Sequence, residues 1–527
     1  MSSPDSESAH PARARLAGLA AAAIALVVYA ATASRYVHPG DPSEFQTMAK
    51  VGGIAHSGYE SAVLMLRLFG HLPIGTMAYR ANLMSCVFGA VAAGLLAFTA
   101  TRWTGNALAS VIAALAFALG RSPWKESTEA GVHPFTLALG AVVFLLAVAF
   151  ARRPTGRGAF LIGACWGFAA LSHLSAFALV PVVLVAVVIA ARAGALRAAH
   201  VGLAIAGLVI GLLPLAYMVS IDRPSQPMNY IEDLMRLEPA EFIREGQVPA
   251  GPIRRVAWLL SGAQYFGYQH GPGYVPDSAL RRSVSLAIDV GFNDFPLLGI
   301  PLAIWGAWVL WRRRRREAML LGLWMLAIFV ITNRVSAGWI AGYFFLPGVW
   351  AIGVLIAAAL DQLTRTRVPA ALPVAGVALI AAPFARLAMP DPPGFLPRVN
   401  LVTSNWGRWP REWNPLRDDR SWDTYGREVM KALPPRAAVL VSWGEGNVLR
   451  YFRYGEPLRP DVHVVHTGPH PGRVAHAVAL ERAEGRPVFA TFGSDQRTPD
   501  SLRFVPVGHW DAGGLWRIDA RESGARH

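Results

Sequence analysis

Eleven apolar stretches follow one another through the first 390 residues of this 527-residue chain. A hydrocarbon layer about 30 Å thick takes roughly 20 apolar residues per helix, and shorter stretches cross where the protein thins the layer. Hydrophobic residues make up 54% of the chain and charged residues only 16%, which excludes a soluble protein of this length. The chain is therefore predicted to be a mainly α-helical, multi-pass membrane bundle. The predicted spans cover residues 16–33, 81–101, 106–120, 135–151, 158–172, 174–191, 201–219, 295–311, 318–332, 338–360 and 369–389.

Lys and Arg residues collect in every second connection between these spans. This pattern is typical of cytoplasmic loops, so the net charge of +15 is a topology signal and predicts no nucleic-acid partner. With the N-terminus in the cytoplasm of a bacterial-type inner membrane, the connections 36–80 and 220–294 and all residues after 390 are predicted to be extracytoplasmic. The basic connections carry Arg13, Arg15, Arg102, Arg152, Arg153, Arg157, Arg192, Arg197, Arg312 to Arg316, Arg365 and Arg367.

The first apolar stretch has two interpretations. Ala-Thr-Ala-Ser before Arg35 resembles a signal-peptide cleavage site, whereas multispanning proteins commonly keep their first helix as an anchor. We favour the anchor, preceded by a disordered cytoplasmic tail at residues 1–15. Cys86 and Cys165 both lie in apolar spans, which argues against a disulfide framework or a cysteine metal site.

Two carboxylates follow the first span directly, in the segment YVHPGDPSEFQTMAKVGGIAHSGY at residues 36–59. Asp41 and Glu44 lie in its Pro/Gly-rich turn, and His56 lies in its second turn. A positioned carboxylate beside the membrane is what base-assisted group transfer requires. The alternative is that Asp41 and Glu44 only stabilise the start of the following helix, as acids do at this position. These residues alone do not separate the two interpretations.

Further polar residues in the extracytoplasmic connections extend the candidate site. The connection 121–134 is short, so its acids must lie near the ends of the flanking helices. His173 lies at a helix junction, where an unpaired polar side chain in lipid is costly, and it either pairs with another helix or faces a cavity. We predict that topology gathers these residues at one membrane surface as substrate-binding candidates. They are His56, Arg80, Glu126, Glu129, His133, His173 and Arg334.

No spacing of these side chains matches a known metal site, so no cofactor is predicted. A divalent metal bound by His56, His133 or His173 together with Asp41 stays open.

The apolar density drops after residue 389. Residues 391–420 are predicted to be a linker, and residues 421–527 a small soluble α/β domain with a parallel sheet, because helical and strand patterns alternate there. The turn WGEGN at 443–447 has no nucleotide-binding fingerprint, and we interpret it as the start of a helix. Predicted helices cover 422–433, 446–454 and 473–484, and predicted strands cover 437–443, 462–466 and 487–492.

Several short motifs occur in a fixed order over most of the chain. They are Gly40-Asp41-Pro42-Ser43-Glu44, Gly53-Ile54-Ala55-His56, Leu72-Pro73-Ile74-Gly75 with Arg80 and Asn82, Ser122-Pro123-Trp124, Tyr343-Phe344-Phe345-Leu346-Pro347, Leu433-Pro434-Pro435 and Arg459-Pro460-Asp461-Val462. In this order they resemble the large family of multi-pass membrane proteins that includes a vertebrate endoplasmic-reticulum protein O-mannosyltransferase.

This resemblance implies a type C glycosyltransferase fold over residues 16–390, a polyprenyl-phosphate sugar as the donor and a protein or glycan hydroxyl as the acceptor. It also implies that the acid of the first extracytoplasmic loop, here Asp41, acts at the transfer step, with Glu44 orienting it or the acceptor. Topology makes Arg80 and Arg334 candidates to neutralise the donor phosphate. The family's GDSGE motif reads GDPSE here.

A second motif also departs from the family, because its Glu-Val-Tyr reads Gly131-Val132-His133 here, which leaves the acceptor open. The rival functions are a transporter or flippase of a lipid-linked intermediate and a non-catalytic assembly partner. Transporters usually carry internal repeats and ionisable residues at mid-membrane. This sequence has no evident repeat, and its acids are predicted to cluster at one membrane surface. Membrane lipids are a predicted partner.

Overall fold

The computed structural model describes residues 5–237, 249–262, 279–295, 298–335, 341–365, 370–388, 416–468, 471–493, 499 and 501–520. The contacts between residues divide the chain into two units. Unit 1 comprises Met1–Ala33, Ser85–Pro214 and Val275–Leu416. Unit 2 comprises Ser34–Met84, Leu215–Tyr274 and Arg417–His527. The tail of the chain therefore groups with two of the predicted extracytoplasmic loops.

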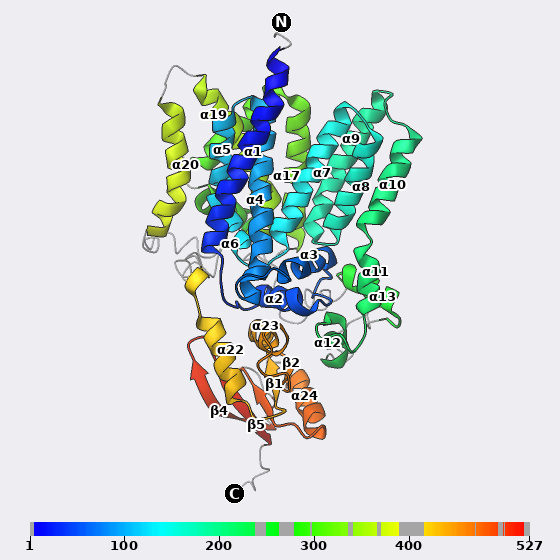
Figure 1. The fold of residues 1–527 in the computed structure, drawn as a ribbon, viewed down its shortest axis with the longest axis vertical. Coiled ribbons are helices and arrows are strands. Elements are labelled where there is room, and N and C mark those ends of the chain that lie inside the picture. Colours follow the sequence, from blue (N-terminus) through cyan, green and yellow to red (C-terminus); the bar gives the residue numbers. More distant parts are fainter. Residues whose placement is uncertain are drawn as a thin grey trace. The chain divides into compact units, whose positions relative to one another are not determined.

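Unit 1 is a bundle of apolar helices that run side by side (Figure 1). By length and composition, seven helices in the described residues can cross a membrane, and α5 with α6, bent by 65°, makes an eighth. The helices are α1 (Asp5–Thr32), α4 (Met77–Thr104), which begins in unit 2, α5 (Ala107–Leu119), α6 (Arg121–Thr128), α7 (His133–Arg152), α8 (Gly156–Ala170), η1 (Leu174–Leu179), α9 (Val180–Arg192), α10 (Ala198–Gly211), α15 (Ala279–Ile288), η3 (Asp289–Asp294), α16 (Gly299–Arg313), α17 (Arg315–Val335), α18 (Ala341–Phe344), α19 (Leu346–Thr364) and α20 (Ala371–Ala388).

The described parts of all eleven predicted spans fall on helices, so the prediction of a multi-pass helical bundle is confirmed. The span predicted at 174–191 is η1 continued by α9, and the span at 201–219 is α10 continued by α11 (Pro214–Ile221). By the same measure, applied to the described residues alone, the predicted spans on α8, α16 and the Ala371–Ala381 part of α20 do not reach the length and composition that crossing requires.

Glycines let several helices of unit 1 approach closely. A Cβ atom at Gly163 of α8 would lie 2.0 Å from the carbonyl oxygen of Ala204 on α10. A Cβ atom at Gly306 of α16 would lie 1.8 Å from the carbonyl oxygen of Leu355 on α19. Small residues at helix contacts are how membrane helices gain close packing without a hydrophobic driving force.

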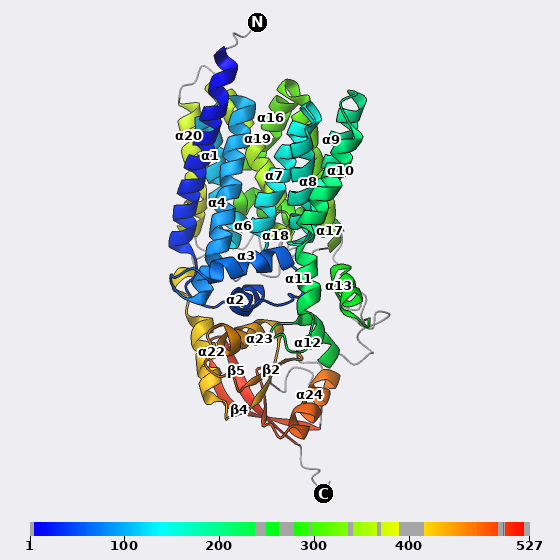
Figure 2. The ribbon, with the colours of Figure 1, turned by 45° about the vertical axis from the view of Figure 1, so that its right-hand side comes forward.

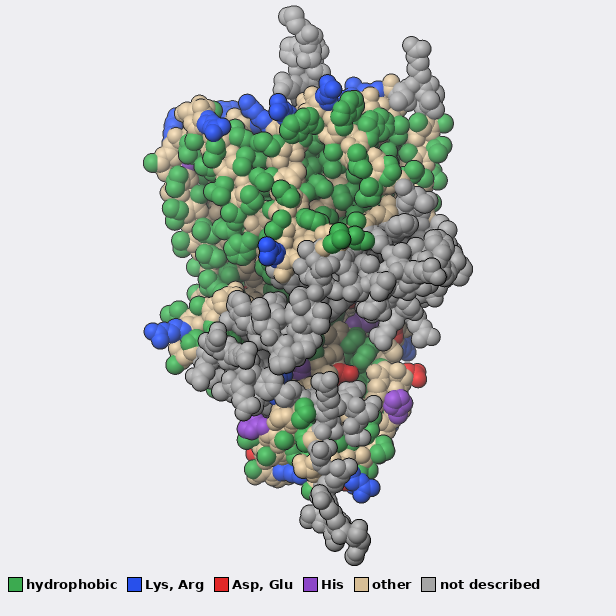
Figure 3. All heavy atoms as spheres, turned by 180° about the vertical axis from the view of Figure 1, so that it is seen from behind, with side chains coloured by type: hydrophobic (Ala, Val, Ile, Leu, Met, Phe, Trp, Pro, Cys, Tyr) green, Lys and Arg blue, Asp and Glu red, His purple; other side chains and the backbone are tan. Residues whose placement is uncertain are grey.

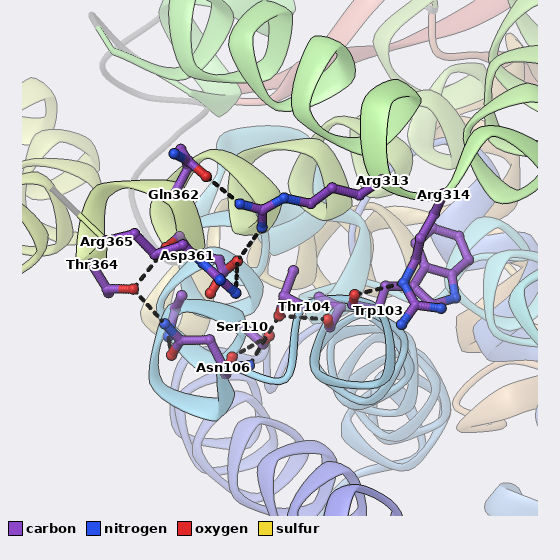
Figure 4. Close-up of polar contacts among 12 residues, drawn as sticks. Trp103, Thr104, Asn106, Ser110, Arg313, Arg314, Asp361, Gln362, Thr364 and Arg365 are labelled. Atoms are coloured by element: carbon purple, nitrogen blue, oxygen red, sulfur yellow. Dashed lines mark hydrogen bonds and ion pairs between the residues drawn. The ribbon is translucent and has the colours of Figure 1, made fainter. Parts of the chain in front are cut away.

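Basic side chains gather at one end of unit 1, while apolar side chains cover its flank (Figure 3). At this end a polar network joins the helix termini (Figure 4). Asp361 is 3% exposed and accepts hydrogen bonds from Arg313 at 2.9 Å and Arg365 at 3.2 Å. Asn106 donates to Thr364 Oγ1 at 3.3 Å, which joins the start of α5 to the end of α19. The basic connections thus lie at one end of the bundle, as the predicted topology requires.

Unit 2 combines short helices with a five-stranded sheet (Figure 2). The strands lie in the order β2-β1-β3-β5-β4, with β1 parallel to β2 and β3, and with β5 antiparallel to β3 and β4. The elements are α2 (Asp41–Val51), α3 (Glu60–Gly70), α12 (Tyr230–Leu237), α13 (Pro252–Leu260), η7 (Leu416–Asp418), α22 (Ser421–Ala432), β1 (Ala438–Val441), α23 (Trp443–Arg450), η8 (Tyr451–Gly455), β2 (His463–His466), α24 (Pro471–Ala483), β3 (Val488–Ala490), β4 (Leu502–Trp510) and β5 (Gly513–Ala520).

The six elements predicted in the tail all form, and the three predicted strands, β1, β2 and β3, pair in parallel as expected. The prediction missed β4 and β5, which add an antiparallel hairpin to this sheet. A proline such as Pro506 is unfavourable inside most strands, because it has no N–H group to donate to the neighbouring strand. The strand tolerates Pro506 because β4 is the outermost strand of the sheet and its register shifts between Pro506 and Gly508. The core of this domain packs Val474 and Val478 of α24 with Leu440 of β1.

Candidate functional site

The loop segment around Asp41 begins α2. Gly40 is the N-cap at a φ of 80°, a conformation that favours glycine, and Pro42 follows in the first turn. Asp41 and Glu44 both lie in that first turn, where they favour the helix, but α2 has no side-chain cap hydrogen bond. The side chain of Asp41 is 54% exposed, whereas that of Glu44 is buried. The two acids therefore have different surroundings, although they lie only three positions apart in the sequence.

Glu44 and His56 form a close pair. Glu44 Oε1 accepts the backbone N–H of His56 at 3.1 Å, and Glu44 Oε2 lies 2.6 Å from His56 Nδ1. Because an ionised carboxylate only accepts hydrogen bonds, Nδ1 is the nitrogen that carries a proton. The other ring nitrogen, Nε2, then faces Asp41 Oδ2 at 3.8 Å. Glu44 thus orients an imidazole toward the exposed carboxylate of Asp41.

Trp443, at the start of α23, also contacts this carboxylate. Its indole Nε1 donates to Asp41 Oδ1 at 2.9 Å, and Asn447 Nδ2 donates to the Gly40 carbonyl at 3.3 Å. Sequence reasoning identified the WGEGN turn as the start of a helix, which α23 confirms, but it did not connect this turn with Asp41. The Gly-rich turn after a strand was the available signal, and its partner lies about 400 residues earlier.

A second polar cluster lies within unit 1. His133 Nδ1 is 2.8 Å from Glu126 Oε2, and the ring of His133 lies 4.7 Å from the ring of His173. His173 Nδ1 is 2.9 Å from the Ser175 hydroxyl, at the start of η1. His133 and His173 therefore meet across a helix junction, and both are largely buried. Lys125 extends this cluster by donating to the hydroxyl of Tyr343 at 2.8 Å.

The predicted arginines have other surroundings. Arg80 donates to the carbonyl oxygens of Ile74 at 2.9 Å, Gly75 at 3.1 Å and Gly70 at 3.3 Å, which ties the turn before α4 to the end of α3. Arg334 is exposed in the last turn of α17. A role for either arginine at a donor phosphate stays a prediction.

The structure thus brings the predicted residues together in two groups. Asp41, Glu44 and His56 meet in unit 2, and Glu126, His133 and His173 meet in unit 1, where Glu129 ends α6 as its C-cap residue. Within the described ranges, no three His, Cys, Asp or Glu side chains are arranged to hold a metal ion.

The helical bundle and the small α/β domain define the type C glycosyltransferase class of fold. Two solved structures of ArnT from Cupriavidus metallidurans share it. The apo form gives a TM-score of 0.57 at 18% identity, covering 95% of this chain and 97% of that one. The form bound to undecaprenyl phosphate gives a TM-score of 0.58 at 16% identity, covering 96% and 99%. The predicted fold is confirmed.

The sequence comparisons point to a particular relative. Residues 41–196 match the family described as the N-terminal domain of protein O-mannosyl-transferase TMEM260. Protein O-mannosyl-transferase TMEM260 of Mus musculus is 24% identical over 468 residues, which cover 83% of this chain and 60% of the mouse protein. This chain therefore matches about 60% of the length of that curated relative. The resemblance inferred from the motifs is confirmed, and of the predicted site residues only Arg334 lies outside the matched segment.

Proposed function

We propose that this protein is a membrane glycosyltransferase that moves a sugar from a polyprenyl-phosphate donor to a hydroxyl group of a protein or glycan. The carrying observation is the exposed carboxylate of Asp41, oriented beside the Glu44–His56 pair at the first residue of the segment that matches the O-mannosyl-transferase family. We further propose that the reaction takes place on the extracytoplasmic face of a bacterial-type inner membrane, with the N-terminus in the cytoplasm.

In the proposed reaction, the acceptor hydroxyl attacks the anomeric carbon of the donor sugar. The bond from that carbon to the phosphate oxygen breaks, the polyprenyl phosphate leaves, and the hydroxyl proton passes to Asp41. A lipid phosphate is already a reasonable leaving group, so the protein must chiefly supply a base, a fixed geometry and positive charge. Half exposure makes Asp41 accessible to an acceptor, while buried Glu44 holds His56 in place next to it.

Positive charge for the leaving phosphate is available in unit 2, the unit of Asp41, from the guanidinium group of Arg80. The hydrogen bonds of Arg80 to three carbonyl oxygens fix its guanidinium group, so this side chain would act with little reorganisation.

The test is transfer by the purified protein from a panel of radiolabelled polyprenyl-phosphate sugars to peptide and glycan acceptors. We expect Asp41→Asn to bind the donor normally but to lose about a hundredfold or more in turnover, because it keeps the shape and loses the base. The matched control is Asp511→Asn, an exposed acid in the turn between β4 and β5. A fully active Asp41→Asn protein, or a wild-type protein that transfers none of the sugars, would overturn the proposal.

A further inference from the structure

The indole N–H of Trp443 donates a hydrogen bond to one of the two carboxylate oxygens of Asp41, and the Nε1 to Oδ1 distance is 2.9 Å. We propose that Trp443 is a positioning residue for Asp41, so that the C-terminal α/β domain completes the active site instead of serving as an accessory. This inference rests on the proposed function, since it assigns the orientation of the proposed base.

The ring of Trp443 is held from several sides. It lies edge-on to His56 at 5.1 Å and to Tyr230 at 6.0 Å, and it is tilted against His466 at 5.2 Å. Burial and two nearby guanidinium groups lower the pKa of His466 to about 3, so this neighbour is neutral at physiological pH. Rings from three different segments therefore restrict the indole to one orientation, with its N–H toward Asp41.

The turn that carries Trp443 is anchored in unit 2 by three contacts. Arg450, at the end of α23, pairs with Asp233 of α12 at 2.7 Å. The buried Tyr451 hydroxyl accepts the backbone N–H of Ala78 at 3.2 Å, at the start of α4. Asn447 binds the carbonyl oxygen of the residue before Asp41. The α/β domain is thus attached to both ends of the first extracytoplasmic loop.

The chemistry of this contact suits a positioning role. An indole N–H only donates hydrogen bonds and has no site that takes up a proton at physiological pH. It therefore fixes Asp41 without competing as a base. Because Oδ1 is bound by Trp443, the second oxygen, Oδ2, which lies 3.8 Å from His56 Nε2, is the one left to receive the acceptor proton.

The first test is kinetic. Trp443→Phe keeps a ring but removes the N–H, and we expect about a 10- to 100-fold loss in kcat with the donor KM changed less than about twofold, as for a misplaced catalytic group. In an Asp41→Asn background the same change should cost less than about twofold, because the two residues act as one unit. Trp422→Phe, a matched change in α22 of the same domain, should leave kcat unchanged. Equal losses with and without Asp41 would overturn the inference.

The second test needs no activity and so separates this inference from the proposed function. The indole N–H resonance of Trp443, assigned by its loss in Trp443→Phe, is measured in protein carrying ¹⁵N-labelled tryptophan. Asp41→Ala should shift this resonance while leaving that of Trp422 in place. An unchanged Trp443 resonance would overturn the inference even if the enzyme is active. A shifted resonance in a protein without transferase activity would support the contact and overturn the proposed function instead.

Discussion

The carboxyl group of Glu60, the first residue of α3, is fully buried, and neither oxygen has a hydrogen-bond partner among the described residues. Burial raises its pKa from 4.5 to about 8. At pH 7 the folded protein therefore keeps this proton, whereas the unfolded chain releases it. Because the folded state binds more protons, the free energy of unfolding falls as the pH rises from about 4.5 to about 8, and it levels off above that.

The loss of stability at pH 7 follows from the interval between the ordinary pKa of the carboxyl group, 4.5, and pH 7. One pKa unit corresponds to about 1.4 kcal/mol, so the roughly 2.5 units between 4.5 and pH 7 cost about 3 kcal/mol of stability. Glu60→Gln keeps the shape and a polar head but has no acidic proton to release. We expect the variant to differ little from the wild type at pH 5 and to be more stable by about 2 to 3 kcal/mol at pH 7.

Thermal unfolding of the detergent-solubilised protein between pH 5 and pH 8.5 measures this difference. The gap in Tm between Glu60→Gln and the wild type should widen steadily with pH up to about 8. Glu484→Gln is the matched control, because the Glu484 side chain is 49% exposed and pairs with Arg486 at the surface, where such pairs contribute little. Parallel pH profiles for Glu60→Gln and the wild type would refute the reasoning, since they would mean that the buried carboxyl is ionised in the fold.

Two further predictions concern the bundle. Gly306→Ala places a Cβ atom 1.8 Å from the Leu355 carbonyl and should destabilise the protein by about 1 to 3 kcal/mol. The control Gly322→Ala, whose Cβ atom would have nothing within 4 Å, should be neutral or stabilise the protein by up to about 1 kcal/mol. Equal Tm values for the two variants would contradict the packing. A reporter fused after Arg316 should report the cytoplasm and one fused after residue 389 the outside, and an external signal at Arg316 would overturn the proposed orientation.

Hydropathy and charge were sufficient to predict the fold class because they report on interactions that every membrane helix must satisfy. In a membrane, the backbone N–H and C=O groups of each apolar stretch must form hydrogen bonds within a helix. Each basic connection marks a helix end, as the network around Asp361 illustrates. The antiparallel hairpin escaped prediction because Pro506 and the partial exposure of all nine β4 residues blur the alternation on which strand assignment depends. The boundaries of the soluble domain stay a prediction.

The candidate site was predictable only where its members share a local pattern. Asp41, Glu44 and His56 lie within one loop, so their proximity follows from a turn and one short helix. Topology placed His133 and His173 on the same side of the bundle, but no pattern in the sequence predicted that their rings would lie 4.7 Å apart. Trp443 was not predictable, since no rule of spacing connects a strand-to-helix turn of the tail with a residue about 400 positions earlier.

The segment 36–80 cannot hold its own geometry, which explains why distant segments converge on it. Its two helices, α2 and α3, have 11 residues each, below the length at which an isolated helix is stable in water. Between them, a Cβ atom at Gly53 would meet the Met228 carbonyl at 2.2 Å, and Ile54 exchanges backbone hydrogen bonds with Met228 and Tyr230. The same short segment carries Tyr230, whose ring packs on Trp443. The orientation of Asp41 is therefore a property of unit 2 as a whole, because the loop acquires its shape only from the chain segments that pack against it.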